Sequence, residues 1–123
     1  MNITEAVENY LETIFILSKR ICGVHAIDIC TELGFSRPTV SEMLKQLKAN
    51  ALFIVDDSNH ITLTEKGTNV ALRIYERHIV ISKLLIKIGV DKETAYEDAC
   101  KIEHDISDVT FECIKNYVDT VND

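Results

Sequence analysis

The chain has 123 residues, of which 46% are hydrophobic, so it can bury most of its apolar side chains in a compact core. Its formal net charge of −7 argues against a protein that coats nucleic acid or anionic membrane without specificity, because Lys and Arg supply most of the affinity in such binding. The sequence has no signal-peptide pattern at its start and no apolar run near the roughly 18 residues that a membrane span needs. We therefore expect a cytoplasmic protein that does not enter the membrane.

The first half of the chain predicts a helix-turn-helix. Apolar residues recur at helical spacing over residues 4–19, and Thr4 is a suitable N-cap for that helix. A second helix is expected to stop at Gly34, and Ser36 can cap a third helix that has Pro38 in its first turn, where a missing N–H costs nothing. Two helices joined by such a short turn are typical of a unit whose second helix enters the major groove of DNA.

A predicted β-hairpin follows the third helix. Leu52–Val55 and His60–Thr64 are two β-rich runs separated by the turn-forming residues 56–59. A hairpin directly after a helix-turn-helix is the wing of a winged-helix domain. We place this DNA-binding domain over residues 1–70.

The start of the third helix is expected to contact DNA. Arg37 can donate two hydrogen bonds to a guanine or meet a phosphate, whereas Lys45 and Lys48 are expected to meet phosphates. Glu42 either accepts a hydrogen bond from cytosine or points away from the DNA. The predicted DNA-binding residues are Ser36, Arg37, Pro38, Thr39, Ser41, Glu42, Lys45 and Lys48.

The second half of the chain predicts further helices. Thr64 can cap a long helix that stops at Gly89, Asp91 starts a short helix to about Asp105, and Ser107 caps a last helix. The long helix is expected to turn Ile88, among others, inward, and the last helix has an apolar stripe formed by Ile114, Tyr117, Val118 and Val121. The fold class is therefore mainly α, with a homodimer formed through residues 80–121. Because residues 71–123 also contain the run CKIEH, whose thiol, carboxylate and imidazole are potential metal ligands, we expect them to form a helical metal-binding and dimerisation region.

The short run CKIEH places three potential metal ligands together. In a helix, Cys100, Glu103 and His104 stand at positions i, i+3 and i+4 and share one face. A buried inert thiol beside an ordinary Glu–His contact explains the same pattern. His25 and His60 have no acidic partner at ligand spacing, so we expect them to face solvent or phosphate. The remaining cysteines, all expected to be reduced, are Cys22, Cys30 and Cys113.

Several segments together resemble a known family. YLETIF, GFSRPTVSEMLKQL, ITLTEKG, YERH, GVDKETAYEDAC and IEHDIS follow one another as in the diphtheria-toxin-repressor and manganese-transport-regulator family of metal-dependent repressors. The resemblance covers nearly the whole chain and implies a homodimer that binds Mn(II) or Fe(II) and then the palindromic operator DNA of metal-homeostasis genes. The metal ligands that it implies are Asn9, Glu12, His78, Cys100, Glu103 and His104.

The implied ligand set mixes two branches of that family. Glu12 resembles the manganese branch and Cys100 the iron branch, whereas Asn9 matches neither. The iron branch also has an ancillary site that includes a residue equivalent to His78, but Ser82 and Tyr96 replace its other two ligands. Carboxylate and amide oxygens suit Mn(II), while a thiolate favours Fe(II), Co(II), Ni(II) or Zn(II), of which the last three are expected to bind in vitro. The larger iron-branch members also have an SH3-like domain, and we expect no such domain in this chain.

Two other functions have to be weighed against a metal-dependent repressor. A metal site with an open position can activate water, but no HExxH, Gly-rich phosphate loop or Ser/His/Asp arrangement is present, so we expect no enzyme. The alternative is a winged-helix regulator that responds to a small organic ligand or to oxidation of Cys100. In the metal-dependent reading, an ion bound by Glu12 and by ligands after the wing would join the first helix to the dimerising region.

Overall fold

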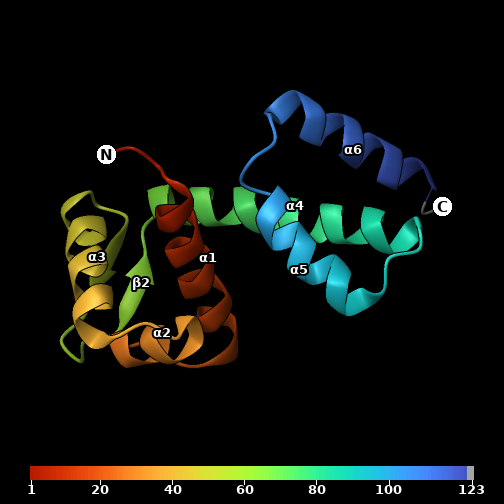
Figure 1. Cartoon of the computed structure of the whole chain (residues 1–123). Coiled ribbons are helices and arrows are strands. Elements are labelled where there is room, and N and C mark those ends of the chain that lie inside the picture. Colours follow the sequence, from red (N-terminus) through yellow and green to blue (C-terminus); the bar gives the residue numbers. More distant parts are fainter. Residues whose placement is uncertain (122–123) are drawn as a thin grey trace. The chain divides into compact units, whose positions relative to one another are not determined.

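The computed structural model describes residues 1–121, within which six helices and one two-stranded antiparallel sheet are found (Figure 1). The chain divides into two compact units, Met1–Leu72 and the part from Arg73 onward. The predicted mainly α fold with a winged helix-turn-helix is confirmed. In chain order the elements are α1 (Glu5–Arg20), α2 (Ala26–Leu33), α3 (Arg37–Ala49), β1 (Phe53–Val55), β2 (Ile61–Leu63), α4 (Glu65–Lys87), α5 (Lys92–Ile102) and α6 (Asp108–Val121).

Local capping fixes the helix-turn-helix of the first unit. The Thr4 hydroxyl accepts a hydrogen bond from the Val7 N–H at 3.3 Å, and the Ser36 hydroxyl accepts one from the Thr39 N–H at 3.4 Å. Gly34 ends α2 in the left-handed region at φ 71°, a conformation that costs a glycine nothing. These predicted caps are confirmed, and they set the short turn that leads into α3.

The wing is a short hairpin attached to the segment before α2. β1 and β2 pair antiparallel with Phe53 opposite Leu63, and the Asp56 carboxylate accepts hydrogen bonds from the Ser58 and His60 N–H groups inside the turn. The Ile61 N–H also donates to the Val24 carbonyl at 2.7 Å. This additional bridge ties the base of the wing to the helix-turn-helix.

One hydrophobic core holds the first unit together. Its fully buried members come from α1, α2, α3, the wing and the start of α4, so each helix contributes one apolar face. They include Leu11, Ile14, Ile29, Val40, Leu47, Leu52 and Ala71.

Gly67, in the first turn of α4, packs directly on the backbone of Leu52. A Cβ atom at position 67 would lie 2.0 Å from the Leu52 carbonyl oxygen, so α4 or the entry to β1 would have to move. We expect Gly67→Ala to destabilise the protein by about 2 kcal/mol, even though alanine is the better helix former by about 1 kcal/mol. Urea unfolding measures this difference. The exposed Asn69 on the same helix supplies the control, because Asn69→Ala should leave stability unchanged or raise it; equal effects of the two substitutions would contradict the packing argument.

The second unit packs α5 and α6 against the later part of α4. Asp91 caps α5 by accepting from the Thr94 N–H at 3.0 Å, and Ser107 caps α6 by accepting from the Thr110 N–H at 3.2 Å, as predicted. A small core joins α4 to α6 and the turn before it. It consists of Val80, Phe111 and Val118 with the partly buried Leu84, Ile106 and Ile114.

Two details of this unit differ from the predictions. α5 ends at Ile102 and not near Asp105, because a buried arginine of α4 takes up the carbonyl oxygens that follow the helix. Ile88, predicted to face inward, lies beyond the end of α4 and is 65% exposed, and Tyr117 of the predicted apolar stripe is 53% exposed.

Over the residues that the structure describes, none of the helices combines the length and apolarity that crossing a bilayer requires.

Candidate metal centre and nucleic-acid interface

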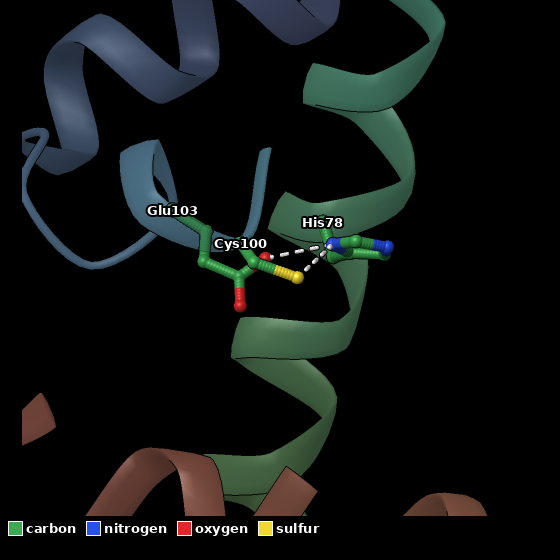
Figure 2. A group of neighbouring side chains, drawn as sticks. All are labelled: His78, Cys100 and Glu103. Carbon is green, nitrogen blue, oxygen red and sulfur yellow. Dashed lines mark hydrogen bonds and ion pairs between the residues drawn. The ribbon is translucent and has the colours of Figure 1, made fainter. Parts of the chain in front are cut away.

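Three potential metal ligands converge in the second unit. His78 projects from the middle of α4, Cys100 from the last turn of α5, and Glu103 is the C-cap residue of α5 (Figure 2). One nitrogen, one sulfur and one oxygen atom from these side chains lie within 4.8 Å of one another. Within residues 1–121, His78, Cys100 and Glu103 form the group of potential ligands whose donor atoms lie close enough together to share one ion.

The imidazole of His78 is at the centre of the cluster. Its Nδ1 lies 3.1 Å from Glu103 Oε2 and 3.6 Å from Cys100 Sγ, as the dashed lines in Figure 2 show. Hydrogen bonding to Cys100, and then to Glu103, raises the pKa of His78 to about 10, although partial burial opposes the rise. At neutral pH a proton on His78 therefore supplies the positive charge that the thiol and carboxylate surround.

Glu103 shows that the cluster suits a cation. Its side chain is 1% exposed. Oε2 lies 3.1 Å from His78 Nδ1, and Oε1 lies 3.4 Å from His104 Nε2 but has no hydrogen bond within the described part of the chain. A buried carboxylate is costly unless it is paired or coordinates a metal. A nitrogen, a sulfur and a carboxylate oxygen at this spacing are a donor set that divalent transition metals accept, so the residues present fit a metal ion.

His104 lies differently from the prediction. The sequence places Cys100, Glu103 and His104 on one helical face, but α5 ends at Ile102 and His104 falls in the turn that follows. The predicted common face is therefore wrong for His104, and His78 of α4 completes the group of three. The His104 side chain is nevertheless buried, with Nε2 3.4 Å from Glu103 Oε1, so it adjoins the cluster on the side of Glu103.

The remaining implied ligands belong to the first unit. Asn9 and Glu12 lie on α1, where both are half-buried, and they stay predicted ligands. At the places of the missing ancillary ligands, Ser82 is buried on α4 and the Tyr96 ring lies 6.0 Å from the His78 ring.

The predicted DNA-binding residues are all exposed, and they divide between two faces of α3. Arg37, Ser41, Lys45 and Lys48, spaced at three and four residues, line an open groove of about 630 Å³ between α3 and the wing. Phe53, Val55 and Asn59 of the wing line its other side. Asn59 is not among the predicted DNA-binding residues. It occupies the wing turn at a positive φ of 62°, and the turn-forming run 56–59 is the sequence feature that indicates its position.

Ser36, Pro38, Thr39 and Glu42 do not line this groove. Ser36 is engaged as the helix cap, and its hydroxyl oxygen lies 2.9 Å from the Thr39 hydroxyl oxygen. These four residues lie at the N-cap and in the first half of α3, outside the groove.

His25 and His60 form a pair at the base of the wing. Their rings meet edge to face with centroids 4.7 Å apart, and His25 lies at the N-cap of α2 and lines the groove. The expectation that neither has an acidic partner is wrong, because His60 Nδ1 lies 3.1 Å from Asp56 and His25 Nδ1 lies 3.8 Å from Asp28. The wing turn is held to the start of α2 by the contact between the two rings and by the His25 Nε2 atom, which lies 3.2 Å from the Ser58 carbonyl oxygen.

A winged helix-turn-helix with a cationic groove, followed by a helical unit with a His/Cys/Glu cluster, defines a DNA-binding protein with a candidate metal site. Family models identify the class further. The DNA-binding N-terminal domain of iron-dependent repressors matches residues 2–61, and their metal-binding and dimerisation domain matches residues 64–123. The chain belongs to the iron-dependent repressor family, as its resemblance predicted.

Individual relatives agree with this assignment. The transcriptional regulator MntR of Escherichia coli is 32% identical over 111 residues, which are 90% of this chain and 72% of the relative. An uncharacterised helix-turn-helix transcriptional regulator of Methanocaldococcus jannaschii is 31% identical and matches 98% of both chains. The solved structure of the manganese regulator SloR superimposes with a TM-score of 0.80 at 30% identity over 97% of this chain, which spans 55% of SloR. The curated relatives are transcriptional regulators.

Proposed function

We propose that this protein is a metal-dependent transcriptional repressor that binds Mn(II) or Fe(II) and then, as a homodimer, binds the palindromic operator DNA of metal-homeostasis genes. The observation that supports the proposal most is the convergence of His78, Cys100 and Glu103 in the unit that matches the family's metal-binding and dimerisation domain. The exposed face of α3 beside the wing supports the DNA-binding part.

The proposed metal site is held mainly by the second unit. His78, Cys100 and Glu103 would bind the ion directly, with His104 beside Glu103, and Asn9 and Glu12 are proposed as further ligands from α1. A bound divalent ion supplies two positive charges where the apoprotein has one imidazolium. The carboxylate and imidazole accept Mn(II) or Fe(II), whereas the thiolate gives Zn(II), Co(II) and Ni(II) an additional advantage.

Anaerobic calorimetry of the reduced protein with Mn(II), Fe(II), Co(II) and Zn(II) tests the site. We expect saturable binding by the parent and none by a Glu103→Ala, His104→Ala double variant. A Glu12→Gln variant run beside it reports whether α1 contributes a ligand. Absence of binding, or binding that the double variant retains, would contradict the proposed site and favour a winged-helix regulator that responds to an organic ligand or to thiol oxidation.

The DNA interface yields a separate prediction. Arg37, at the first position of α3, is exposed and lines the groove, which supports the proposal that it makes a bidentate contact to guanine. In the metal-loaded protein, Arg37→Ala is expected to weaken operator binding by about tenfold or more, and binding to random duplex DNA much less. Fluorescence anisotropy with both duplexes measures the two losses.

Arg20→Ala is the matched control, because Arg20 is an exposed arginine of the same unit that pairs with Glu32. Its removal should leave the ratio of operator to random affinity unchanged. If Arg37→Ala weakens both duplexes equally, Arg37 contacts phosphate and does not read a base.

A further inference from the structure

The second unit contains a buried cation that the ligand set does not include. The Arg77 side chain, which precedes His78 on α4, is 3% exposed. A buried guanidinium is costly unless its donors are satisfied. Nε of Arg77 has no hydrogen bond within residues 1–121, so the partners of the two terminal nitrogens indicate what Arg77 does.

Those partners are concentrated in the turn between α5 and α6. One terminal nitrogen of Arg77 donates to the Glu103 carbonyl at 3.1 Å and to the Ile106 carbonyl at 2.8 Å. The other donates to the Asp108 carboxylate at the start of α6. The guanidinium carbon also lies 5.2 Å from the centre of the Phe111 ring. The planar guanidinium thus bridges the end of α5, the turn and the first residues of α6.

Glu103 is consequently held at two points by neighbouring residues of α4. Its carboxylate meets the His78 imidazole at 3.1 Å, and its backbone carbonyl meets Arg77 at 3.1 Å. Its own N–H remains bonded to the Ala99 carbonyl at 3.0 Å, which fixes it relative to α5. The backbone of Glu103 is thus bonded to both α4 and α5, while its buried carboxylate faces His78.

We propose that Arg77 is a positioning residue for the metal site: it holds the backbone of Glu103 so that the carboxylate is oriented toward the ion before the ion arrives. The inference rests on the proposed function, since it takes Glu103 as a ligand. Residues that orient a metal ligand without contacting the metal commonly lower the metal affinity by about 10–100-fold when they are removed. The same guanidinium joins the ligand turn to α6, so it also links the metal site to the helix at the end of the matched dimerisation domain.

Co(II) is the appropriate probe, because its visible absorption bands report the number and arrangement of its ligands as well as its affinity. Arg77→Lys keeps the charge and the long stem but cannot reproduce the planar fork, and Arg77→Met removes every donor. We expect Arg77→Lys to bind Co(II) about tenfold more weakly and Arg77→Met about a hundredfold more weakly. At saturating Co(II), both spectra should differ from that of the parent.

Arg73→Met is the matched control. Arg73 lies one turn earlier on α4 and also pairs with Asp108, at 2.8 Å, but it is half exposed, and the carbonyl of Glu103 is bonded to Arg77. This variant should retain the parental affinity and spectrum. A purely structural role for Arg77 would lower the melting temperature and leave the spectrum at saturation unchanged.

Parental Co(II) affinity and spectrum in a folded Arg77→Lys protein would overturn the inference, whether or not Arg77→Met folds. Failure of the proposed function looks different. In that case the parent itself does not bind Co(II), or the Glu103→Ala, His104→Ala variant binds it equally well.

Discussion

Lowering the pH from about 8 to about 6 is expected to weaken metal binding by about a hundredfold through His78 alone. Cys100 and Glu103 raise the pKa of His78 to about 10 in the metal-free protein, so the imidazole is protonated throughout this range. A metal ion that takes Nδ1 must displace that proton, and each pH unit below the pKa then lowers the apparent affinity by about tenfold. Protons and the metal compete for Nδ1 of His78, so metal binding weakens as the pH falls.

Calorimetry of Mn(II) binding in buffers of different ionisation enthalpy measures the released protons directly. His78→Gln should release about one proton fewer than the parent and have a correspondingly shallower pH dependence. His60→Gln, which changes a histidine of the wing, should behave as the parent does. Equal proton release by the parent and His78→Gln would show that the metal does not bind at Nδ1 of His78.

The same pKa shift affects the stability of the metal-free protein. Because the folded pKa of His78 is raised above the ordinary value of 6.5, its contribution to stability is fully present below about 6.5 and is lost as the pH rises through about 10. Metal binding replaces this interaction, so the loaded protein should lose less stability over that window.

Replacement of Cys100 by serine is expected to lower Zn(II) affinity by about a hundredfold or more and Mn(II) affinity by about tenfold or less. The thiol is exposed and lies 3.6 Å from His78, within the proposed ligand group. Zn(II) gains more from a soft thiolate than Mn(II) does, so the loss should depend on the metal. Competition titrations with a chromophoric chelator give both affinities.

Cys113→Ser is the control, because Cys113 is an exposed thiol on α6 and should affect neither metal. If Cys100→Ser weakens Zn(II) and Mn(II) by the same factor, then Cys100 shapes the site without binding the ion. An unchanged affinity for both metals would remove it from the site.

The sequence predicts those parts of the fold that depend on neighbouring residues. Thr4, Ser36 and Ser107 are caps whose partners lie three residues away, and Gly34 ends its helix through its own backbone. The sequence predicts an end of α5 that is three residues too late, because the true end depends on Arg77, which is 26 residues from Glu103 in the chain. No local pattern contains that information.

For the candidate site, too, the sequence predicts only the arrangement that depends on neighbouring residues. Helical spacing brings Cys100 and Glu103 together correctly, because α5 extends far enough for positions i and i+3 to share a face. Spacing is misleading for His104, which lies past the end of the helix. His78 belongs to another helix, 22 residues before Cys100, so no periodicity could connect it to the cluster; family resemblance alone predicted it.

The most direct test of a metal-dependent repressor is the binding of a palindromic duplex, selected from a random library by the Mn(II)-loaded protein, with Mn(II) and with a chelator. We predict that Mn(II) tightens duplex binding by the parent at least tenfold, and that the duplex tightens Mn(II) binding by the same factor, as linkage requires. The Glu103→Ala, His104→Ala variant should bind the duplex weakly under both conditions. Equal duplex affinity of the parent with Mn(II) and with chelator would contradict the proposed function.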